Sequence, residues 1–339
     1  MNDSLYHPQI DFNGASVLIT GGTGSFGKVF VRTLFERYTP DRVVVLSRDE
    51  MKHEEMQRLY PREQYPAMRF FLGDVRDADR LTMAMADIEY VVHAAAQKIV
   101  PLAEYNSFEC VHTNVLGMEN VVRAALRNGV KRVIALSTDK AASPVNLYGA
   151  TKLASDKICV AANHLRGKSG PIFSVVRYGN VLNSRGSVVP LFRRLLEESP
   201  ESDLPVTDAQ MTRFWITLPQ AVDFVLSCFE VMRGGEVFVP KIPSMRLLDL
   251  VEAIAPGKSY NIVGIRPGEK LHEAMITLDE ARHTVDFSDR YIIEPNIALY
   301  QRQSFLDDGA TAVEPDFSYT SNGNDVWLSV DELRGLIQD

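Results

Sequence analysis

The stretch SVLITGGTGSFG, residues 16–27, decides the fold of this 339-residue chain. A short run of branched apolar residues leads directly into glycines at positions 21, 24 and 27, and a helical pattern follows over residues 27–38. Glycine permits a sharp turn from strand to helix and lets a pyrophosphate approach the backbone N–H groups and the positive end of the helix. The stretch predicts the dinucleotide-binding turn of a Rossmann domain, with cofactor contacts expected from Gly21, Thr23, Gly24, Ser25, Phe26 and Gly27.

Outward from this turn, short β-rich runs alternate with helical patterns through the first half of the chain. Strands are expected at residues 16–20, 42–47, 69–72, 90–93, 132–137 and 173–177. Between them, segments such as 27–38 and 114–128 repeat apolar residues at helical spacing. Strands rich in Val, Ile and Leu that alternate with helices are typical of a doubly wound sheet. The expected fold class is α/β, a Rossmann-type parallel sheet with a smaller C-terminal substrate-binding domain.

The pattern loosens after about residue 180, where eight prolines from position 190 to position 267 separate shorter elements. We therefore expect an NADP-binding Rossmann domain over residues 1–180, rejoined by about residues 213–240. Residues 181–339 are expected to form mainly the nucleotide-sugar-binding domain and a C-terminal tail, which closes with a helix over residues 327–336.

Composition and charge exclude several classes of protein. The formal net charge of −8 and the absence of basic runs argue against nucleic acid as a partner. No apolar stretch reaches the roughly 20 residues needed to span a bilayer, and the N-terminus does not resemble a signal peptide. Cys110, Cys159 and Cys228 are widely spaced, which argues against disulfides and metal sites. We expect a cytoplasmic protein with no membrane or metal partner, in which a few local cations hold any anionic substrate.

The residues after the second strand bear on the choice of cofactor. An Asp or Glu at this point favours NAD, but the chain has Ser47 and Arg48, with Lys52 one turn later. A guanidinium and an ammonium suit a 2′-phosphate, so we expect NADP, although Asp49 leaves a solvated helix start as an alternative. The later strand ends add further expected cofactor contacts, which are Asp74, Val75, Ala94, Ala95, Ala96 and Lys98.

The fifth strand leads into the residues that predict catalysis. It ends in Thr138, Asp139 and Lys140, and Tyr148 and Lys152 follow with the spacing Y-x-x-x-K. Residues at i and i+4 share one face of a helix, so Lys152 can lower the pKa of the Tyr148 phenol and bind the nicotinamide ribose. Tyr148 can then remove an alcohol proton while hydride leaves for the cofactor.

The ordered runs TGGTGSFG, LSRDEMK, GDVRD, HAAAQK, STDKAASPVNLYGATK, RYGNVLNSRGSVVP and RPGEKLHE resemble the extended short-chain dehydrogenase/reductase superfamily. Within it, they resemble the inverting UDP-N-acetylglucosamine 4,6-dehydratases that open pseudaminic acid and related sugar pathways. The resemblance covers about residues 14–290. The chain departs from the pattern at Gln97 and Ile99, where Leu and His are expected, and at Asn183, where a small residue is expected. The acylamino sugar accepted therefore stays open.

The resemblance implies a reaction that regenerates its cofactor. Oxidation of C4 of the hexose acidifies the C5 hydrogen, the C6 hydroxyl is lost as water, and hydride returns to C6. By similarity, Lys140 handles the C5 proton and Asp139 assists the loss of water. Because Lys140 must be neutral to act as a base, we expect burial or a nearby cation to lower its pKa. Return of the proton to the opposite face inverts C5.

The resemblance also assigns substrate contacts. Asn180 follows the sixth strand at the mouth of the crevice and is expected to touch the nucleotide sugar. Arg213 and Arg266, together with Glu269, are expected to hold the diphosphate and the uridine ribose. Lys98 is expected to touch cofactor phosphate or substrate, and Lys140 is expected to contact the substrate. The remaining expected contacts are Val181 with the cofactor, and Arg185, Ser187 and Val188 with the substrate.

Three readings of the chain remain open on sequence alone. A nucleotide-sugar 4-epimerase, or a dehydratase acting on another UDP-sugar, shares the fold and the Tyr148–Lys152 pair but differs in product. A non-catalytic NADP-sensing regulator could dispense with that pair.

A homo-oligomer, dimer or hexamer, is implied by resemblance, with the helices over residues 114–128 and 148–164 as candidate dimer faces.

Overall fold

The computed structural model describes residues 6–182, 187–297, 300 and 302–338 of the chain. A large central sheet has the strand order β3-β2-β1-β4-β5-β6-β10, all parallel, and is continued by the antiparallel strands β15-β14-β16. The parallel strands are β1 (Ser16–Thr20), β2 (Arg42–Ser47), β3 (Met68–Leu72), β4 (Tyr90–His93), β5 (Arg132–Thr138), β6 (Ile172–Tyr178) and β10 (Val237–Pro240). The expected α/β fold is confirmed.

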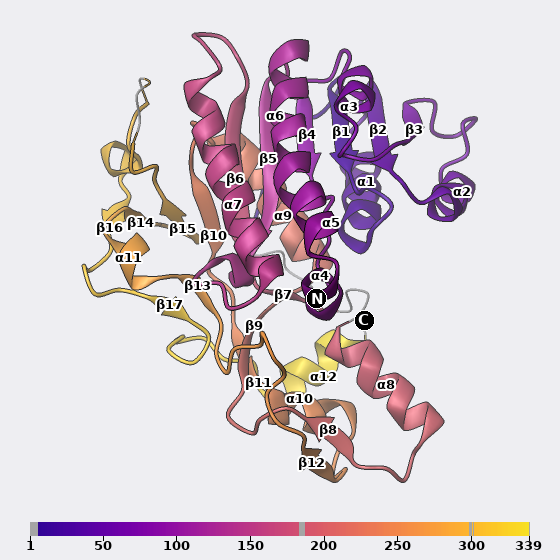
Figure 1. Ribbon diagram of the computed structural model, residues 1–339, viewed down its shortest axis with the longest axis vertical. Helices are drawn as coiled ribbons and strands as arrows, with labels where there is room; N and C mark the ends of the chain where they lie inside the picture. Colours follow the sequence, from indigo (N-terminus) through magenta and orange to yellow (C-terminus); the bar gives the residue numbers. More distant parts are fainter. Residues whose placement is uncertain (1–5, 183–186, 298–299, 301, 339) are drawn as a thin grey trace.

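Helices cover both faces of this sheet (Figure 1). On one face α6 (Gly117–Asn128) and α7 (Leu147–Ala161) run side by side, with α3 (Ala78–Ala84) packed on α6. On the other face α1 (Ser25–Arg37) packs against α9 (Leu218–Val231). The shorter helices α2 (Glu50–Leu59), α4 (Val100–Tyr105) and α5 (Ser107–Val111) flank the carboxyl ends of the strands.

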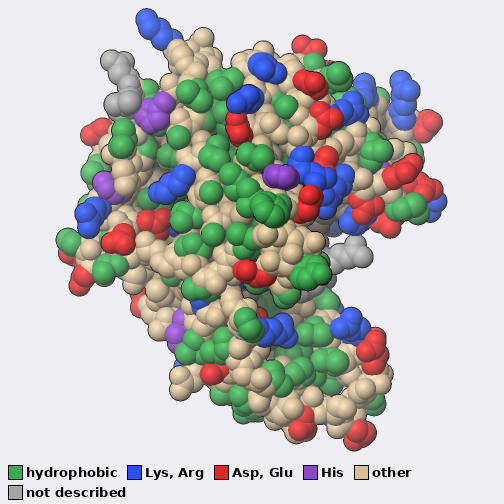
Figure 2. All heavy atoms as spheres, in the orientation of Figure 1, with side chains coloured by type: hydrophobic (Ala, Val, Ile, Leu, Met, Phe, Trp, Pro, Cys, Tyr) green, Lys and Arg blue, Asp and Glu red, His purple; other side chains and the backbone are tan. Residues whose placement is uncertain are grey.

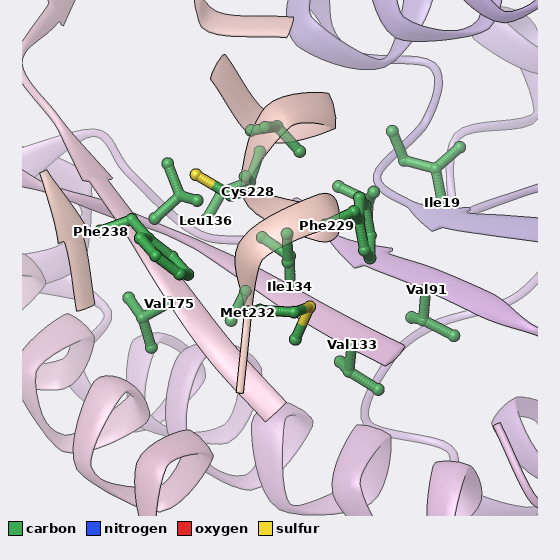
Figure 3. Packing of buried hydrophobic residues seen from close by; sticks show 14 of the residues in the cluster. Ile19, Val91, Val133, Ile134, Leu136, Val175, Cys228, Phe229, Met232 and Phe238 are labelled. Atoms are coloured by element: carbon green, nitrogen blue, oxygen red, sulfur yellow. The ribbon is translucent and has the colours of Figure 1, made fainter. Parts of the chain in front are cut away.

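The core explains why the central strands are almost continuously apolar. Every residue of β1 is buried, and the middle of β2 and β5 is buried as well. Figure 3 shows Cys228, Phe229 and Met232, from α9 and its end, against Val133 and Ile134 of β5. A parallel strand covered by helices on both faces buries successive side chains on both, so it cannot alternate apolar and polar residues.

One edge of the sheet comes from a part of the chain that we expected in the second domain. Residues of β14 (Thr284–Phe287) and β15 (Arg290–Ile293) form an antiparallel hairpin that pairs β15 with β10, and β16 (Thr311–Ala312) pairs with β14. Ser288 turns this hairpin with φ +55°, without the Asn-Gly or Asp-Gly pair that signals such a turn. The boundaries of the two domains stay a prediction.

A smaller lobe lies below the sheet in Figure 1 and has its own hydrophobic cluster. It contains α8 (Val188–Glu198), β8 (Leu204–Val206), α10 (Leu247–Ile254), β12 (Tyr260–Ile262) and α12 (Val330–Gln338). A second sheet of β7 (Asn180–Val181), β9 (Thr212–Ile216) and β11 (Ser244–Arg246) joins it to the large body. The last helix begins at Val330, later than expected, because Ser329 and Glu332 cap each other's backbone N–H groups.

The surface carries both signs of charge, interspersed over the face shown in Figure 2. The three cysteines are unpaired and buried. Within residues 6–182, 187–297, 300 and 302–338, no helix combines the length and the apolar character that crossing a membrane requires.

Candidate active site

The turn after β1 has the shape that a dinucleotide phosphate requires. Gly21 has φ +67°, and a Cβ there would lie 2.9 Å from Cα of Ala95. A Cβ at Gly27 would lie 2.2 Å from the carbonyl oxygen of Gly22, so the turn and α1 pack backbone to backbone. The N-cap residue of α1 is Gly24, so no N-cap side chain hydrogen-bonds the first N–H groups of this helix. The first turn of α1 also carries no Asp or Glu. Its N–H groups and positive end are therefore available to an anion.

The ends of β2 and β3 bring the expected ribose contacts together. The Thr23 hydroxyl donates to Oγ of Ser47 at 3.0 Å. Arg48 is 56% exposed and reaches Oδ2 of Asp74 at 3.5 Å. Asp49 caps α2 by accepting from the backbone N–H of Lys52, and it also pairs with the Lys52 ammonium at 2.7 Å. Arg48 is thus placed beside Asp74, whereas Asp49 competes for Lys52.

Small residues after β4 lie against the glycine turn. The N–H of Ala94 donates to the carbonyl of Thr20, and the N–H of Ala95 donates to the Thr20 hydroxyl. Val75, after β3, is buried and packs against Gly117, where a Cβ would lie 2.8 Å from its Cγ2. Ala96 and Lys98 continue the same segment and are exposed.

The predicted catalytic residues converge where β5 meets α7. Thr138 ends β5, and Asp139 and Lys140 form the short helix η2 (Asp139–Ala141). A Cβ at Gly149, the residue after Tyr148, would lie 2.1 Å from the carbonyl oxygen of Lys140. Only glycine permits α7 to approach η2 this closely, and the approach brings Tyr148 to the Asp139–Lys140 segment.

Tyr148 and Lys152 are both buried in α7. Burial raises the pKa of Tyr148 to about 12, against which the charge of Lys140 and a hydrogen bond with Thr138 act. The chief cation near the phenol is therefore Lys140, whereas the sequence predicted Lys152. Burial lowers the pKa of Lys152, and Asp156, one turn later, partly opposes this.

Lys140 is held by oxygen atoms on three sides. Its Nζ lies 3.0 Å from Oδ1 of Asp139, 3.3 Å from Oε1 of Glu273 and 3.3 Å from Oδ1 of Asn180. Burial alone lowers the pKa of Lys140, but the two carboxylates outweigh it and the pKa is raised. The expectation of a lowered pKa is wrong, because two buried carboxylates face the ammonium.

Glu273 is the residue that sequence reasoning missed. It precedes β13 (Ala274–Ile276), its side chain is 2% exposed, and it also faces Arg213 at 3.9 Å and Lys270 at 3.8 Å. Burial and the charge of Asp139 raise the pKa of its carboxyl. Its only signal in the sequence is its place at the end of RPGEKLHE, a run whose other charged residues drew the assignment.

The predicted diphosphate and ribose contacts come from β9, which holds Arg213, and from the segment before β13, which holds Arg266 and Glu269. The buried guanidinium of Arg213 donates to the carbonyls of Thr212, Lys270 and Leu271, so its donors already support this segment. Arg266 is exposed. Among the described residues, Oε2 of Glu269 is buried without a hydrogen-bond partner. The roles expected for these three stay predictions.

The other expected substrate contacts surround the junction of the lobes. Asn180 and Val181 form β7, which pairs with Trp215 and Ile216 of β9. Ser187 occupies the N-cap position of α8, but its buried Oγ makes no hydrogen bond in the part of the chain that the structure describes. Val188 is the first residue of α8. Arg185 lies outside the described residues.

Two buried networks that the sequence did not reveal position the catalytic helix. Asn114 lies in the π-helical turn His112–Leu116 before α6. Its side-chain amide accepts from the backbone N–H of Gln97 and donates to the backbone carbonyl of Gln97. The same amide donates to Oγ1 of Thr151 at 3.0 Å. Asp156 accepts from Oγ of Ser137 at 2.7 Å and faces Arg177 at 3.8 Å. Both networks fix α7 against the strand ends.

Comparison with known proteins gives the chain its relatives. The family model described as "Polysaccharide biosynthesis protein" matches residues 17–295. The inverting UDP-N-acetylglucosamine 4,6-dehydratase of Campylobacter jejuni subsp. jejuni serotype O:23/36 (strain 81-176) is 52% identical over 331 residues, covering 96% of this chain and 98% of the relative. A UDP-glucose 4-epimerase of Rickettsia bellii (strain OSU 85-389) is 37% identical over 333 residues, or 96% of each chain.

Solved structures give the same result for the fold. The X-ray structure of Pen from Bacillus thuringiensis superposes with a TM-score of 0.87 at 36% identity, covering 97% of this chain and 99% of that one. A dTDP-glucose 4,6-dehydratase from Streptomyces venezuelae with NAD and TYD bound superposes with a TM-score of 0.67 at 24% identity, covering 76% and 86%. The second likeness is one of fold alone.

Proposed function

This chain belongs to the polysaccharide biosynthesis protein family and, within it, to the inverting UDP-N-acetylglucosamine 4,6-dehydratases, and from this premise we propose its reaction. It is an enzyme that takes UDP-N-acetylglucosamine to UDP-2-acetamido-2,6-dideoxy-β-L-arabino-hexos-4-ulose, with loss of water and inversion at C5. The observation that carries the proposal is the Asp139–Lys140 pair at the end of β5, held beside Tyr148 by the close approach at Gly149.

The cofactor proposed is NADP, on a turn that fits a nicotinamide dinucleotide. Support comes from the open start of α1 and from Gly21, where a side chain would collide with Ala95. Arg48 and Lys52 supply the cations that suit a 2′-phosphate. When bound there, the cofactor would supply hydride transfer, from C4 of the sugar and back to C6.

Tyr148 and its neighbours act at C4. The buried phenolate of Tyr148 takes the C4 hydroxyl proton as the ketone forms, and Lys152 binds the nicotinamide ribose from the next turn of α7. Burial alone makes the phenolate unfavourable, so the positive charge of Lys140 assists its formation. The Thr138 hydroxyl orients the phenol.

Lys140 and Asp139 act at C5 and C6. The ketone at C4 acidifies the C5 hydrogen, which Lys140 removes as a neutral amine. Asp139 passes a proton from Lys140 to the C6 hydroxyl, which leaves as water. Oδ1 of Asp139 faces Lys140, and its Oδ2 has no hydrogen-bond partner among the described residues, so the carboxylate keeps an oxygen free to hold the proton.

The nucleotide sugar is proposed to lie where the two lobes meet. Asn180 presents its amide from β7 beside Lys140. The partnerless Oε2 of Glu269 is suited to a ribose hydroxyl, and Arg266 supplies an exposed cation for the diphosphate. Lys98, Arg185, Ser187 and Val188 complete the proposed contacts. The cytoplasmic location and the homo-oligomer expected from the sequence belong to this proposal too.

A 4-epimerase is the second candidate, because Rickettsia relatives with that name are 37% identical. An epimerase returns hydride to C4 and has no use for an acid and a base at C5 and C6. The Asp139–Lys140 pair therefore favours dehydration.

The decisive experiment is incubation of the purified protein with UDP-N-acetylglucosamine. Mass spectrometry should show a product lighter by one water, and NMR should show a C4 ketone, a C6 methyl group and the inverted C5. A product of unchanged mass would support the epimerase, and no product from this substrate would refute the proposal.

A further inference from the structure

The strongest unassigned feature of the site is a second buried carboxylate against Lys140. The Lys140 ammonium lies between Asp139 and Glu273, with Nζ–O distances of 3.0 and 3.3 Å. Both acidic side chains are almost fully buried, at 1% and 2% exposure. A single ammonium opposite two buried carboxylates holds its proton firmly, yet the proposed reaction needs Lys140 as a free amine.

We propose that Glu273 is a positioning residue that takes a proton from Lys140 and so frees the amine for the C5 proton. This assignment rests on the proposed dehydration. The proton moves from Nζ of Lys140 to the Glu273 carboxylate, leaving an uncharged amine and a carboxylic acid. No oxidant or reductant is needed, because only a proton changes place.

The protons balance through the elimination. The C5–H bond breaks, its proton goes to the Lys140 amine, and its electron pair enters the enolate of the C4 ketone. A proton then passes from Lys140 through Asp139 to the C6 oxygen as the C6–O bond breaks and water leaves. Glu273 finally returns its proton to Lys140. The three side chains therefore end in the protonation states in which they began.

The surroundings of Glu273 suit this role. Its Oε1 is the oxygen that faces Lys140, and its Oε2 has no hydrogen-bond partner within the described residues, so a proton taken by the carboxylate displaces no other hydrogen bond there. Lys140 is its nearest cation, at 3.3 Å, since Arg213 at 3.9 Å and Lys270 at 3.8 Å lie beyond hydrogen-bonding distance. Burial and the nearby Asp139 also raise the pKa of the Glu273 carboxyl, which favours its protonated form.

The backbone of Glu273 is fixed, so its side chain is held at Lys140. Its N–H donates to Oγ of Ser321 at 2.9 Å, and the N–H of Ser321 donates to its carbonyl at 2.8 Å. Lys270 donates to the carbonyl of Ala142, just after η2, at 2.6 Å. The carboxylate and Lys140 thus share one rigid frame.

The test is Glu273→Gln in the full-length enzyme with its cofactor, because the amide keeps the size and polarity but cannot take the proton. We expect the rate of product formation to fall by about 10²-fold, within the range for a positioned proton transfer, with KM for UDP-N-acetylglucosamine within about twofold. Incorporation of solvent deuterium at C5 should fall in parallel. Oxidation at C4 should persist, seen as absorbance of the trapped reduced cofactor.

The pH profile separates proton exchange from mere support of the fold. The charged groups that face Glu273 are Asp139, Lys140, Arg213 and Lys270. Glu273 must be a carboxylate to take the proton, so parental kcat should fall as the pH drops through its pKa. That acidic limb should vanish in Glu273→Gln and return, at a reduced rate, in Glu273→Asp.

A matched control is Glu236→Gln, which removes a fully buried carboxylate paired with Arg302 at 2.8 Å, away from the site. It should lower the melting temperature and leave the acidic limb of kcat unchanged. If the parent converts the substrate and Glu273→Gln keeps both the parental rate and the acidic limb, the inference is overturned. If Glu273→Gln does not fold, the parental pH profile decides, since a kcat without an acidic limb also overturns the inference. A parent that makes no product instead refutes the proposed function.

Discussion

Lys152, which is buried, and Lys140, which is partly buried, lie near each other at the end of the sheet, and their pKa values move in opposite directions. Lys152 loses hydration in α7, which Asp156 and Cys159 only partly oppose, and its pKa is lowered. Lys140 loses hydration too, but Asp139 and Glu273 together raise its pKa. Burial therefore does not decide the charge of a lysine by itself, because the number of carboxylates facing it sets the balance. The neutral amine needed at C5 has to be produced within the catalytic cycle.

Tyr148→Phe tests the assignment at C4. The ring keeps its packing in α7, but the phenolic proton carrier is lost, so kcat should fall by about 10²–10⁴-fold. The measurement is the rate of 4-keto product formation from UDP-N-acetylglucosamine.

The control for Tyr148→Phe is Tyr319→Phe. Tyr319 is also buried, but among the described residues its hydroxyl hydrogen-bonds the backbone of Ile242 and none of the proposed catalytic side chains. That variant should lose stability by about 1–3 kcal/mol and keep kcat. Near-parental activity in Tyr148→Phe would rule out the phenol as the base.

Arg48→Asp tests the choice of cofactor. Arg48 is the exposed cation nearest the end of β2, and a carboxylate in its place would repel a 2′-phosphate and could accept bonds from ribose hydroxyls. The ratio of Kd for NAD to Kd for NADP should be well above one in the parent and should fall at least tenfold in the variant. Equal affinities in the parent would contradict the NADP assignment.

At the scale of single residues, the sequence predicted what is local. Asp139 and Lys140 are adjacent, and Tyr148 and Lys152 are one turn apart, so their grouping needed only a strand and a helix. Glu273 comes from a distant segment that reaches η2 only through tertiary contacts. The pKa of Lys140 is raised by the adjacent Asp139 together with Glu273 of that segment, and the direction predicted from the sequence was wrong because it set burial against no carboxylates.

At the scale of elements, the approach of α7 to η2 rests on one glycine. Gly149→Ala should destabilise the protein and lower kcat, because its Cβ would meet the Lys140 carbonyl at 2.1 Å. Helix propensity alone predicts the opposite, a gain of about 1 kcal/mol. Unfolding in urea and the rate of C5 deuterium incorporation measure the two effects.

Gly335→Ala is the control for this prediction. Gly335 lies in α12, and a Cβ there meets nothing within 4 Å among the described residues. This variant should show the ordinary gain in stability and parental kcat. If Gly149→Ala behaves in the same way, α7 and η2 do not need their close contact.

Strands could be predicted from the sequence where both faces of the sheet are buried, because such a strand is a continuous apolar run. The bounds of β1, β2 and β4 agree with the expectation residue for residue. The hairpin β14–β15 was missed, because its strands are short, β14 carries the polar residue Asp286, and its turn lacks a strong signal. The π-helical turn His112–Leu116 was missed as well, since an apolar pattern does not distinguish it from an α-helix.

At the scale of the whole molecule, the substrate has to join two bodies that have separate cores. The large cluster spans the central sheet, and the small one holds α8, α10 and α12. The segment before β13 crosses between them, where Asn146 donates to the carbonyl of Gly268 at 2.7 Å. A ligand held by this segment and by the start of α8 would therefore restrain the small lobe on the large one.

This arrangement predicts that UDP and NADP protect different parts of the molecule from hydrogen exchange. UDP should protect peptides of α8 and α10 in the small lobe, and NADP should protect the β1–α1 turn. At a UDP concentration of 100 times Kd, opening of the small lobe should cost about 2.7 kcal/mol more, a roughly hundredfold slower exchange.

Arg266→Ala should remove most of the UDP effect, because it takes away the exposed cation proposed for the diphosphate. Arg334→Ala, which removes another exposed arginine of the same lobe, paired with Asp331 at 2.7 Å, should leave it intact. Protection by UDP confined to the large lobe would place the nucleotide elsewhere, and an unchanged response in Arg266→Ala would free that residue from the diphosphate.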